Sequence, residues 1–137
     1  EADFTIDGEH PYLYENPAIA NHVSSTTFFE VSRQLMKATC HLFFGVPVKS
    51  RFLLKTVAME FDRWGKIGKP VTAVIGVVSP GRCLNPFGTY EFTLSFYQDG
   101  WLLGTMKSVI STMPAEVEDR LMSRQYRQSP ANCNNAA

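Results

Sequence analysis

Charged residues are scarce in this sequence of 137 residues, and neither sign of charge prevails. Asp, Glu, Lys and Arg make up 19% of the chain, with 13 acidic and 13 basic side chains and a formal net charge of zero. A nucleic-acid binder needs a surplus of Lys and Arg gathered on one face to hold phosphates, and no such cluster occurs. The composition therefore argues against nucleic acid as a partner.

The sequence also lacks any apolar run near the roughly 18 residues that a membrane-spanning helix requires. Its first residues, EADFTIDGEH, are acidic, unlike a signal peptide. Cys40, Cys83 and Cys133 are odd in number and widely spaced, which fits neither a disulfide framework nor a CxxC metal motif. We therefore expect a cytoplasmic protein with no membrane partner, while the first residue, Glu1, leaves open that the chain is a piece of a longer protein.

Metal ligands with suitable spacing are missing as well. His10, His22 and His41 stand far apart, with no cluster of Cys or carboxylate side chains beside them, so no metal site is expected. The glycines of the segment WGKIGKP lack the spacing of a phosphate-binding loop, which favours a simple turn. The sequence therefore predicts no metal and no cofactor.

Hydrophobic residues, in contrast, make up 45% of the chain, which is enough for a folded domain. We expect a single domain over residues 1–128 and a disordered C-terminal tail over residues 129–137. A small neutral domain of this composition is expected to hide part of its apolar surface in an oligomer.

A stretch of 21 residues without Gly or Pro, Ser24 to Phe44, predicts one long helix. Thr27 and Glu30 have the spacing of a capping box at its start, and Gly45 with Pro47 predicts its end. Apolar residues recur within it at steps of three and four. They predict the buried face of the helix as Phe28, Val31, Leu35, Ala38 and Leu42.

Segments rich in β-branched and aromatic residues follow the helix and predict strands. They are Arg51 to Asp62, Val71 to Ser79, Thr89 to Gln98 and Trp101 to Thr112. Asp99-Gly100 predicts a two-residue hairpin of the primed type between the last two. We also expect a short strand around Tyr12 to Tyr14 and a short polar helix over Ala115 to Gln128.

This order of elements predicts an α+β fold in which a curved antiparallel sheet wraps one long central helix. Such a sheet leaves its edges uncovered, so edge-to-edge pairing of two chains into a homodimer is expected. The arrangement is that of the hotdog fold.

The predicted helix carries one stripe of polar side chains, Glu30, Arg33, Lys37 and His41. As a solvated face, the stripe would hold only a weak ion pair. In a helix enclosed by its sheet, a buried carboxylate would need its arginine partner, and the pair would form a site. His22 precedes the helix N-terminus, whose N–H groups are able to hold an oxyanion, although a lone histidine is also typical of a surface loop.

Three segments together resemble the A-factor biosynthesis hotdog family: Asn21-His22-Val23-Ser24-Ser25, Phe29-Glu30-Val31-Ser32-Arg33-Gln34 and Phe44-Gly45-Val46-Pro47. Members of that family typically carry Asp-His-Val-Pro-Gly, then Glu-x-x-Arg-Gln on a helix and a Gly-Val-Pro turn. The chain departs from the pattern where Asn21 replaces Asp and Ser24-Ser25 replaces Pro-Gly. It also has one hotdog unit where family members usually have two.

This resemblance implies acyl transfer in specialised metabolism. Family enzymes take a β-ketoacyl group from an acyl carrier protein and esterify dihydroxyacetone phosphate, on the way to γ-butyrolactone signals. The resemblance implies an acyl carrier protein or acyl-CoA as partner, and catalytic roles for Glu30, Arg33 and His22. Glu30 is able to take the proton of an attacking hydroxyl, and Arg33 to orient Glu30 or bind a phosphate. The residues expected to bind substrate are Asn21, Ser24, Ser25, Thr26, Phe29 and Gln34.

Two alternatives use the same residues. Hotdog relatives also include thioesterases and β-hydroxyacyl dehydratases, which use a carboxylate on the same helix with a water or a nearby histidine, and either activity suits Glu30 and His22. A non-catalytic hotdog unit would only bind an acyl ligand or a partner, with Glu30 and Arg33 as a structural pair. The sequence leaves open the acyl chain length, the acceptor and the choice between transfer, hydrolysis and dehydration.

Overall fold

The computed structural model describes residues 1–6, 22–79 and 87–127. The strand expected at Tyr12 to Tyr14 and the tail over residues 129–137 lie outside these ranges. The described elements are the strands β1 (Ala2–Phe4), β2 (Arg51–Phe61), β3 (Val71–Ser79), β4 (Gly88–Gln98) and β5 (Trp101–Met113), with the helices α2 (Ser25–Phe43) and α3 (Ala115–Arg127). The short strand β1 had no counterpart in the sequence pattern.

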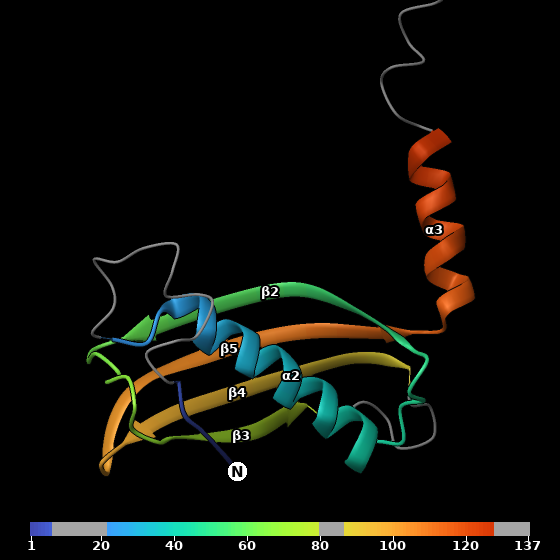
Figure 1. Cartoon of the computed structure of the whole chain (residues 1–137). Coiled ribbons are helices and arrows are strands. Elements are labelled where there is room, and N and C mark those ends of the chain that lie inside the picture. The colour runs from blue at the N-terminus through green and yellow to red at the C-terminus, as the bar shows by residue number, and fades with distance from the viewer. Residues whose placement is uncertain (7–21, 80–86, 128–137) are drawn as a thin grey trace, which may run out of the picture.

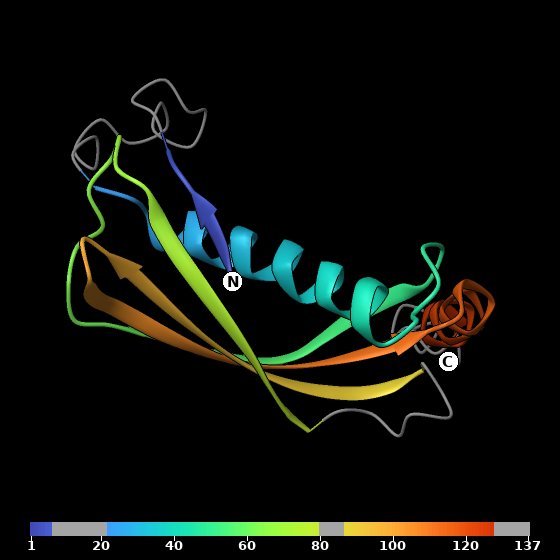
Figure 2. The ribbon, with the colours of Figure 1, turned by 90° about the horizontal axis from the view of Figure 1, so that it is seen from below.

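The strands form one antiparallel sheet in the order β1-β3-β4-β5-β2. The sheet curves around α2, which lies across its concave face (Figures 1 and 2). Asp99 and Gly100, with φ of 52° and 77°, form the hairpin between β4 and β5, as the primed turn requires. The predicted α+β hotdog fold is therefore confirmed.

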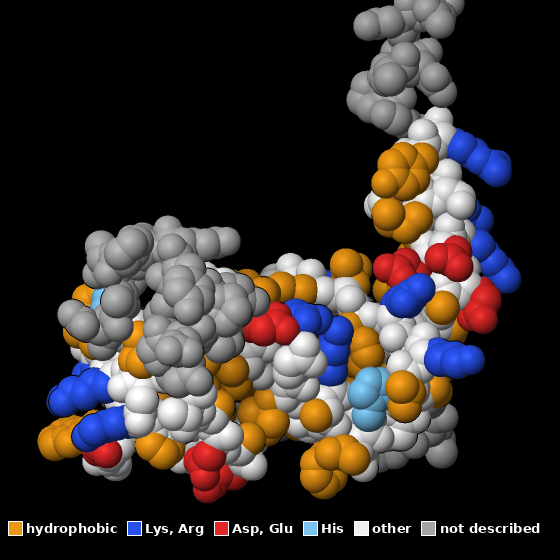
Figure 3. Space-filling view, in the orientation of Figure 1, with side chains coloured by type: hydrophobic (Ala, Val, Ile, Leu, Met, Phe, Trp, Pro, Cys, Tyr) orange, Lys and Arg blue, Asp and Glu red, His pale blue; other side chains and the backbone are white. Residues whose placement is uncertain are grey.

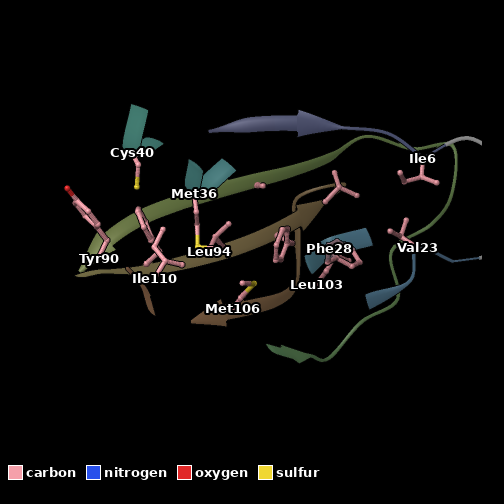
Figure 4. Close-up of a cluster of buried hydrophobic side chains, with 14 of the residues drawn as sticks. Ile6, Val23, Phe28, Met36, Cys40, Tyr90, Leu94, Leu103, Met106 and Ile110 are labelled. Atoms are coloured by element: carbon pink, nitrogen blue, oxygen red, sulfur yellow. The ribbon is translucent and has the colours of Figure 1, made fainter. Parts of the chain in front are cut away.

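The core lies between α2 and the middle strands of the sheet. From α2, the buried side chains of Phe28, Met36 and Cys40 point toward β4 and β5 (Figure 4). On the strands they meet Tyr90, Leu94, Met106 and Ile110. Burial raises the pKa of the Cys40 thiol to about 11, so this cysteine packs as a neutral side chain.

The predicted buried face of the helix is wrong in part. Val31 and Leu35 are only half-buried, Ala38 is exposed, and Leu42 is 76% exposed. The residues buried instead are Thr27, Phe28, Ser32, Met36, Thr39 and Cys40. Ser32 and Thr39 fit this face because each hydroxyl donates to the carbonyl four residues earlier, at 2.7 and 2.8 Å. Apolar periodicity alone misses such internally satisfied polar residues.

The ends of α2 are set by local hydrogen bonds. Ser24 is the N-cap, and its hydroxyl accepts from the Thr27 N–H at 3.3 Å. The predicted capping box of Thr27 and Glu30 is therefore wrong, because Thr27 lies inside the first turn. The predicted end is confirmed: Gly45 follows the helix with φ of 67°, and the Val46 N–H donates to the Cys40 carbonyl at 3.1 Å.

The C-terminal helix α3 confirms the helix expected after the last strand. It projects away from the sheet (Figure 1) and has no buried residue. One ion pair ties it to β2, between Arg51 Nε and Glu118 Oε2 at 2.8 Å. No helix in the described ranges is long and apolar enough to cross a membrane.

Candidate active site

A cavity of about 210 Å³ lies at the N-terminus of α2, which we call the N-terminal cavity. Aromatic and apolar side chains form most of its wall, and an imidazole, two hydroxyls and a guanidinium supply hydrogen-bonding groups. Its lining residues are His22, Val23, Ser24, Ser25, Phe28, Phe61, Arg63, Trp64 and Gly65. Such a wall suits an apolar group that carries one polar function.

Two segments distant in sequence hold this cavity together. The Val23 N–H donates to the Gly65 carbonyl at 2.7 Å, and His22 pairs with Lys66 as an isolated bridge. The rings of His22 and Trp64 lie 4.3 Å apart between centroids. Glycine suits this close approach, because a Cβ at position 65 would lie 3.1 Å from Phe28 Cζ, a tight contact. The loop after β2 therefore fixes His22 beside the helix N-terminus.

A second cavity, of about 80 Å³, lies further along the seam between α2 and β2, and we call it the arginine cavity. Its lining residues are Phe29, Arg33, Met36, Lys37, Phe52, Leu54 and Ile110. The ammonium of Lys37 lies 5.6 Å from the centre of the Phe52 ring. The cavity thus combines two cations with apolar walls.

Arg33 is held in a fixed orientation by Glu30. Arg33 Nε and Nη2 donate to Glu30 Oε2 and Oε1 at 2.8 and 2.7 Å, and Gln34 Nε2 adds a third hydrogen bond to Oε1 at 2.8 Å. The hydrogen bond from Arg33, then that from Gln34, lowers the pKa of Glu30 from 4.5 to about 2. The side chains of Arg33 and Glu30 are 39% and 34% exposed, so the pair is neither enclosed by the sheet nor fully solvated.

His41, the last member of the predicted stripe, belongs to the end of the helix rather than to a cavity. Its Nδ1 lies 2.7 Å from the Val46 carbonyl, and its ring packs edge-on against Phe52 at 5.3 Å between centroids. These contacts give His41 a structural role where the chain leaves α2.

The structure divides the predicted site residues between the two cavities. His22, Ser24 and Ser25 line the N-terminal cavity, whereas Phe29 and Arg33 line the arginine cavity. The eight residue steps from Ser25 to Arg33 correspond to about 12 Å along the helix. His22 and Arg33 therefore face different parts of the same seam.

The remaining predicted residues take other places. Glu30 and Gln34 line neither cavity and act on the orientation of Arg33. Thr26 is exposed and lines neither cavity. Asn21 lies outside the described residues.

Several lining residues were not found from the sequence. Phe61, Arg63, Trp64 and Gly65 come from the end of β2 and the loop after it. The sequence predicted that loop only as a turn. The loop lies beside the helix because the Val23 N–H donates to the Gly65 carbonyl. In the sequence, a tryptophan followed by a glycine between charged residues is the signal that could have drawn attention to this loop.

Within the described ranges, no group of three or more metal-ligating side chains occurs. The polar side-chain groups of the two cavities are instead an imidazole, two hydroxyls, two guanidiniums and one ammonium. These groups are able to bind and orient an acyl compound or an anion, and to move a proton.

Comparison with known proteins gives one family and a set of similar folds. The sequence model of the A-factor biosynthesis hotdog domain matches residues 1–114. A hot-dog-like protein from Thermanaerovibrio acidaminovorans has a TM-score of 0.70 at 14% identity, over 90% of this chain and 87% of that one. A comparison with curated proteins gives no significant match.

Two further similar structures are described as thioesterases. A probable thioesterase from Bartonella henselae has a TM-score of 0.61 at 13% identity, over 84% of this chain and 90% of that one. A mutant of a fluoroacetyl-CoA-specific thioesterase, in complex with fluoroacetate and CoA, has a TM-score of 0.67 at 10% identity, over 90% and 96%. At these identities, the likeness establishes the shared hotdog fold.

Proposed function

The chain belongs to the A-factor biosynthesis hotdog family, and on this premise we propose that it transfers an acyl group from a carrier-bound thioester to a hydroxyl of a small phosphorylated acceptor. The observation that carries the proposal is the arrangement of groups along the seam between α2 and β2. There, an apolar cavity with hydrogen-bonding side chains lies on the same helix as an arginine held by two hydrogen bonds.

The acyl thioester is assigned to the N-terminal cavity. Phe28, Phe61 and Trp64 offer the apolar walls that an acyl chain needs. Ser24 and Ser25 place the N-terminus of α2 at the same cavity, and the positive end of the helix dipole stabilises negative charge on a carbonyl oxygen. Both features support a thioester carbonyl bound at this point.

The acceptor is assigned to Arg33 and Lys37. A guanidinium and an ammonium that line one cavity are suited to a phosphate group. Glu30 is a positioning residue in this proposal, because three hydrogen bonds hold it ionised and a carboxylate with a pKa near 2 is a weak base. His22 is the side chain of the N-terminal cavity that is able to accept the proton of the attacking hydroxyl.

The proposed step balances without a cofactor. The hydroxyl oxygen of the acceptor attacks the thioester carbon and forms the ester bond, while its proton passes to His22. The carbon–sulfur bond then breaks, and the thiolate of the carrier takes up the proton as the free thiol. The negative charge that develops on the carbonyl oxygen faces the N-terminus of α2.

The working form in this proposal is a dimer in which two β2 strands pair edge to edge. Strand β2 is the last strand of the sheet, and within the described ranges no other strand pairs with its outer edge. Leu53, Leu54 and Val57 on this strand are 52%, 38% and 41% exposed. An edge with exposed apolar side chains is the surface that a second chain would cover.

The proposal is tested by incubating the full chain with a β-ketoacyl carrier protein and dihydroxyacetone phosphate. Intact mass is expected to show loss of the acyl group from the carrier and a mass gain on the acceptor. Arg33→Leu is expected to reduce transfer about 100-fold, since a charged anion contact contributes about 3 kcal/mol. Glu30→Ala is expected to raise KM for the acceptor because Arg33 loses its support.

A matched control is Arg124→Leu, which removes an exposed arginine of α3. Transfer in the Arg124→Leu variant is expected to equal that of the wild type. Unchanged transfer in Arg33→Leu and Glu30→Ala would refute the assignment of those residues, and no loss of acyl group from the carrier would refute the enzyme proposal.

Thioester hydrolysis is the second candidate, because two of the similar structures are described as thioesterases. The same experiment separates the candidates. Hydrolysis would release the free acid without acceptor, and dehydration of a β-hydroxyacyl carrier protein would lower its mass by one water.

A further inference from the structure

The helix α3 carries an apolar face that the described part of its own chain does not cover. Val117, Leu121, Met122 and Tyr126 are 39%, 45%, 43% and 73% exposed (Figure 3). The helix begins directly after the 114 residues that match the family domain. It therefore lies outside the part of the chain that matches the family model, and it exposes apolar side chains of its own.

This face stands at one end of the β2 edge. Met113, the last residue of β5, pairs with Arg51, the first residue of β2, so α3 starts beside the start of β2. From there α3 extends past the outer edge of β2, in a direction that crosses the strands (Figures 1 and 2). A groove of about 120 Å³ lies in the corner between helix and strand. Its lining residues are Arg51, Phe52, Leu53, Met113, Glu118, Leu121, Met122 and Gln125.

The charges along β2 favour a second copy of the chain as the occupant of this corner. The first half of the strand carries Arg51 and Lys55, and its second half carries Glu60, with Asp62 directly after it. Antiparallel pairing of two such edges sets the basic half of one strand against the acidic half of the other, twice by symmetry. The groove continues this edge, since it includes Phe52 and Leu53.

Antiparallel pairing also decides which part of the partner reaches α3. The end of the partner's β2 would lie beside the start of β2, and the loop after it would enter the corner groove. That loop carries Trp64, which is 75% exposed in the single chain and lines the N-terminal cavity. An exposed tryptophan and an uncovered apolar helix face would thus meet.

We propose that α3 of each protomer packs over the N-terminal cavity of the other, with Leu121 and Met122 against the partner's Trp64. This inference rests on the β2-edge dimer of the proposed function. Each acyl cavity would then be formed by two chains. One chain supplies His22 and the other lining residues, and its partner supplies α3, which covers the cavity. The cover excludes water from the thioester, which favours transfer to the acceptor over hydrolysis.

The shielding of Trp64 tests this packing. The sequence has two tryptophans, so Trp101→Phe leaves Trp64 as the only one. In this background we expect acrylamide to quench the fluorescence of the dimer weakly. Leu121→Glu is expected to increase the quenching constant severalfold, because a buried carboxylate would displace α3. Ser123→Glu, which adds the same charge on the opposite side of α3, is expected to leave quenching unchanged.

The molar mass from light scattering, measured on the same samples, separates the two proposals. A dimer in which Trp64 is quenched equally with and without Leu121→Glu would overturn the packing of α3 and leave the dimer standing. A monomer would overturn the β2-edge dimer and, with it, the packing of α3. Helical content by circular dichroism checks that α3 persists in the Leu121→Glu and Ser123→Glu variants.

A disulfide between chains gives a second, independent test. Within one chain, α3 and Trp64 lie at opposite ends of β2, about 33 Å apart for ten residue steps along a strand. With Cys83 and Cys133 replaced by serine, Trp64→Cys combined with Met122→Cys is expected to form a covalent dimer under mild oxidation. Trp64→Cys combined with Ser123→Cys is the matched control and is expected to remain non-covalent. Equal cross-linking of both pairs, or of neither, would contradict the packing.

Discussion

Glu30 receives hydrogen bonds from Arg33 and Gln34 that favour its ionised form. The sequence identified Glu30 and Arg33 as partners from their spacing and from the family resemblance. It did not indicate which of the two would face a cavity, because both lie in the same polar stripe. In the structure, Arg33 lines the arginine cavity and Glu30 supports it. The proposed function therefore gives the role of the base to His22 and a positioning role to Glu30.

The low pKa of Glu30 makes a prediction about stability and pH. Since the pKa in the folded state is about 2, below the ordinary 4.5, the ionised pair stabilises the fold above about pH 4.5, and this contribution is lost as the pH falls toward 2. We expect Glu30→Gln to lower the free energy of unfolding at pH 7. The difference from the wild type should shrink between pH 4.5 and 2, as measured by urea denaturation. A difference that stays constant over this range would show that Glu30 titrates normally.

At the scale of the element, α2 shows which sequence signals carry structural information. Its two ends were predicted within one residue, the start from the stretch without Gly or Pro and the end from Gly45, although the predicted capping box was wrong. Its buried face was predicted less well, because Ser32 and Thr39 satisfy their own hydroxyls and are buried beside Met36. Burial of polar helix residues is decided by the sheet, which the helix sequence does not contain.

The cap of α2 provides a prediction at this scale. Ser24→Ala removes the hydroxyl that accepts from the Thr27 N–H and is expected to lower the free energy of unfolding by about 1 kcal/mol. Thr26→Ala, at an exposed position of the first turn, is expected to change it by less than about 0.5 kcal/mol. Equal effects of the two substitutions, measured by thermal or urea unfolding, would contradict the assignment of Ser24 as the cap.

At the scale of the whole molecule, the order of one helix and four long strands was enough to predict the hotdog fold. Of the residues that line the two cavities, the sequence singled out mainly those of α2 and of the segment just before it. His22 and Arg33 were singled out because they belong to motifs, whereas Phe52 and Trp64 belong to β2 and the loop after it, which only the folded chain brings beside α2. If the β2 edges pair as proposed, part of the exposed apolar surface of this chain of zero net charge lies between two protomers.

The central claim is that the acyl group of a carrier-bound thioester lies in the N-terminal cavity beside His22. Photolabelling with an acyl pantetheine that bears a diazirine at the end of its acyl chain tests it most directly, with the labelled residues mapped by peptide mass spectrometry. The expected labels fall on Phe61, Trp64 and Phe28, and an excess of unlabelled acyl pantetheine should suppress them. Labels that spare the N-terminal cavity and fall elsewhere on the chain would contradict the proposed site.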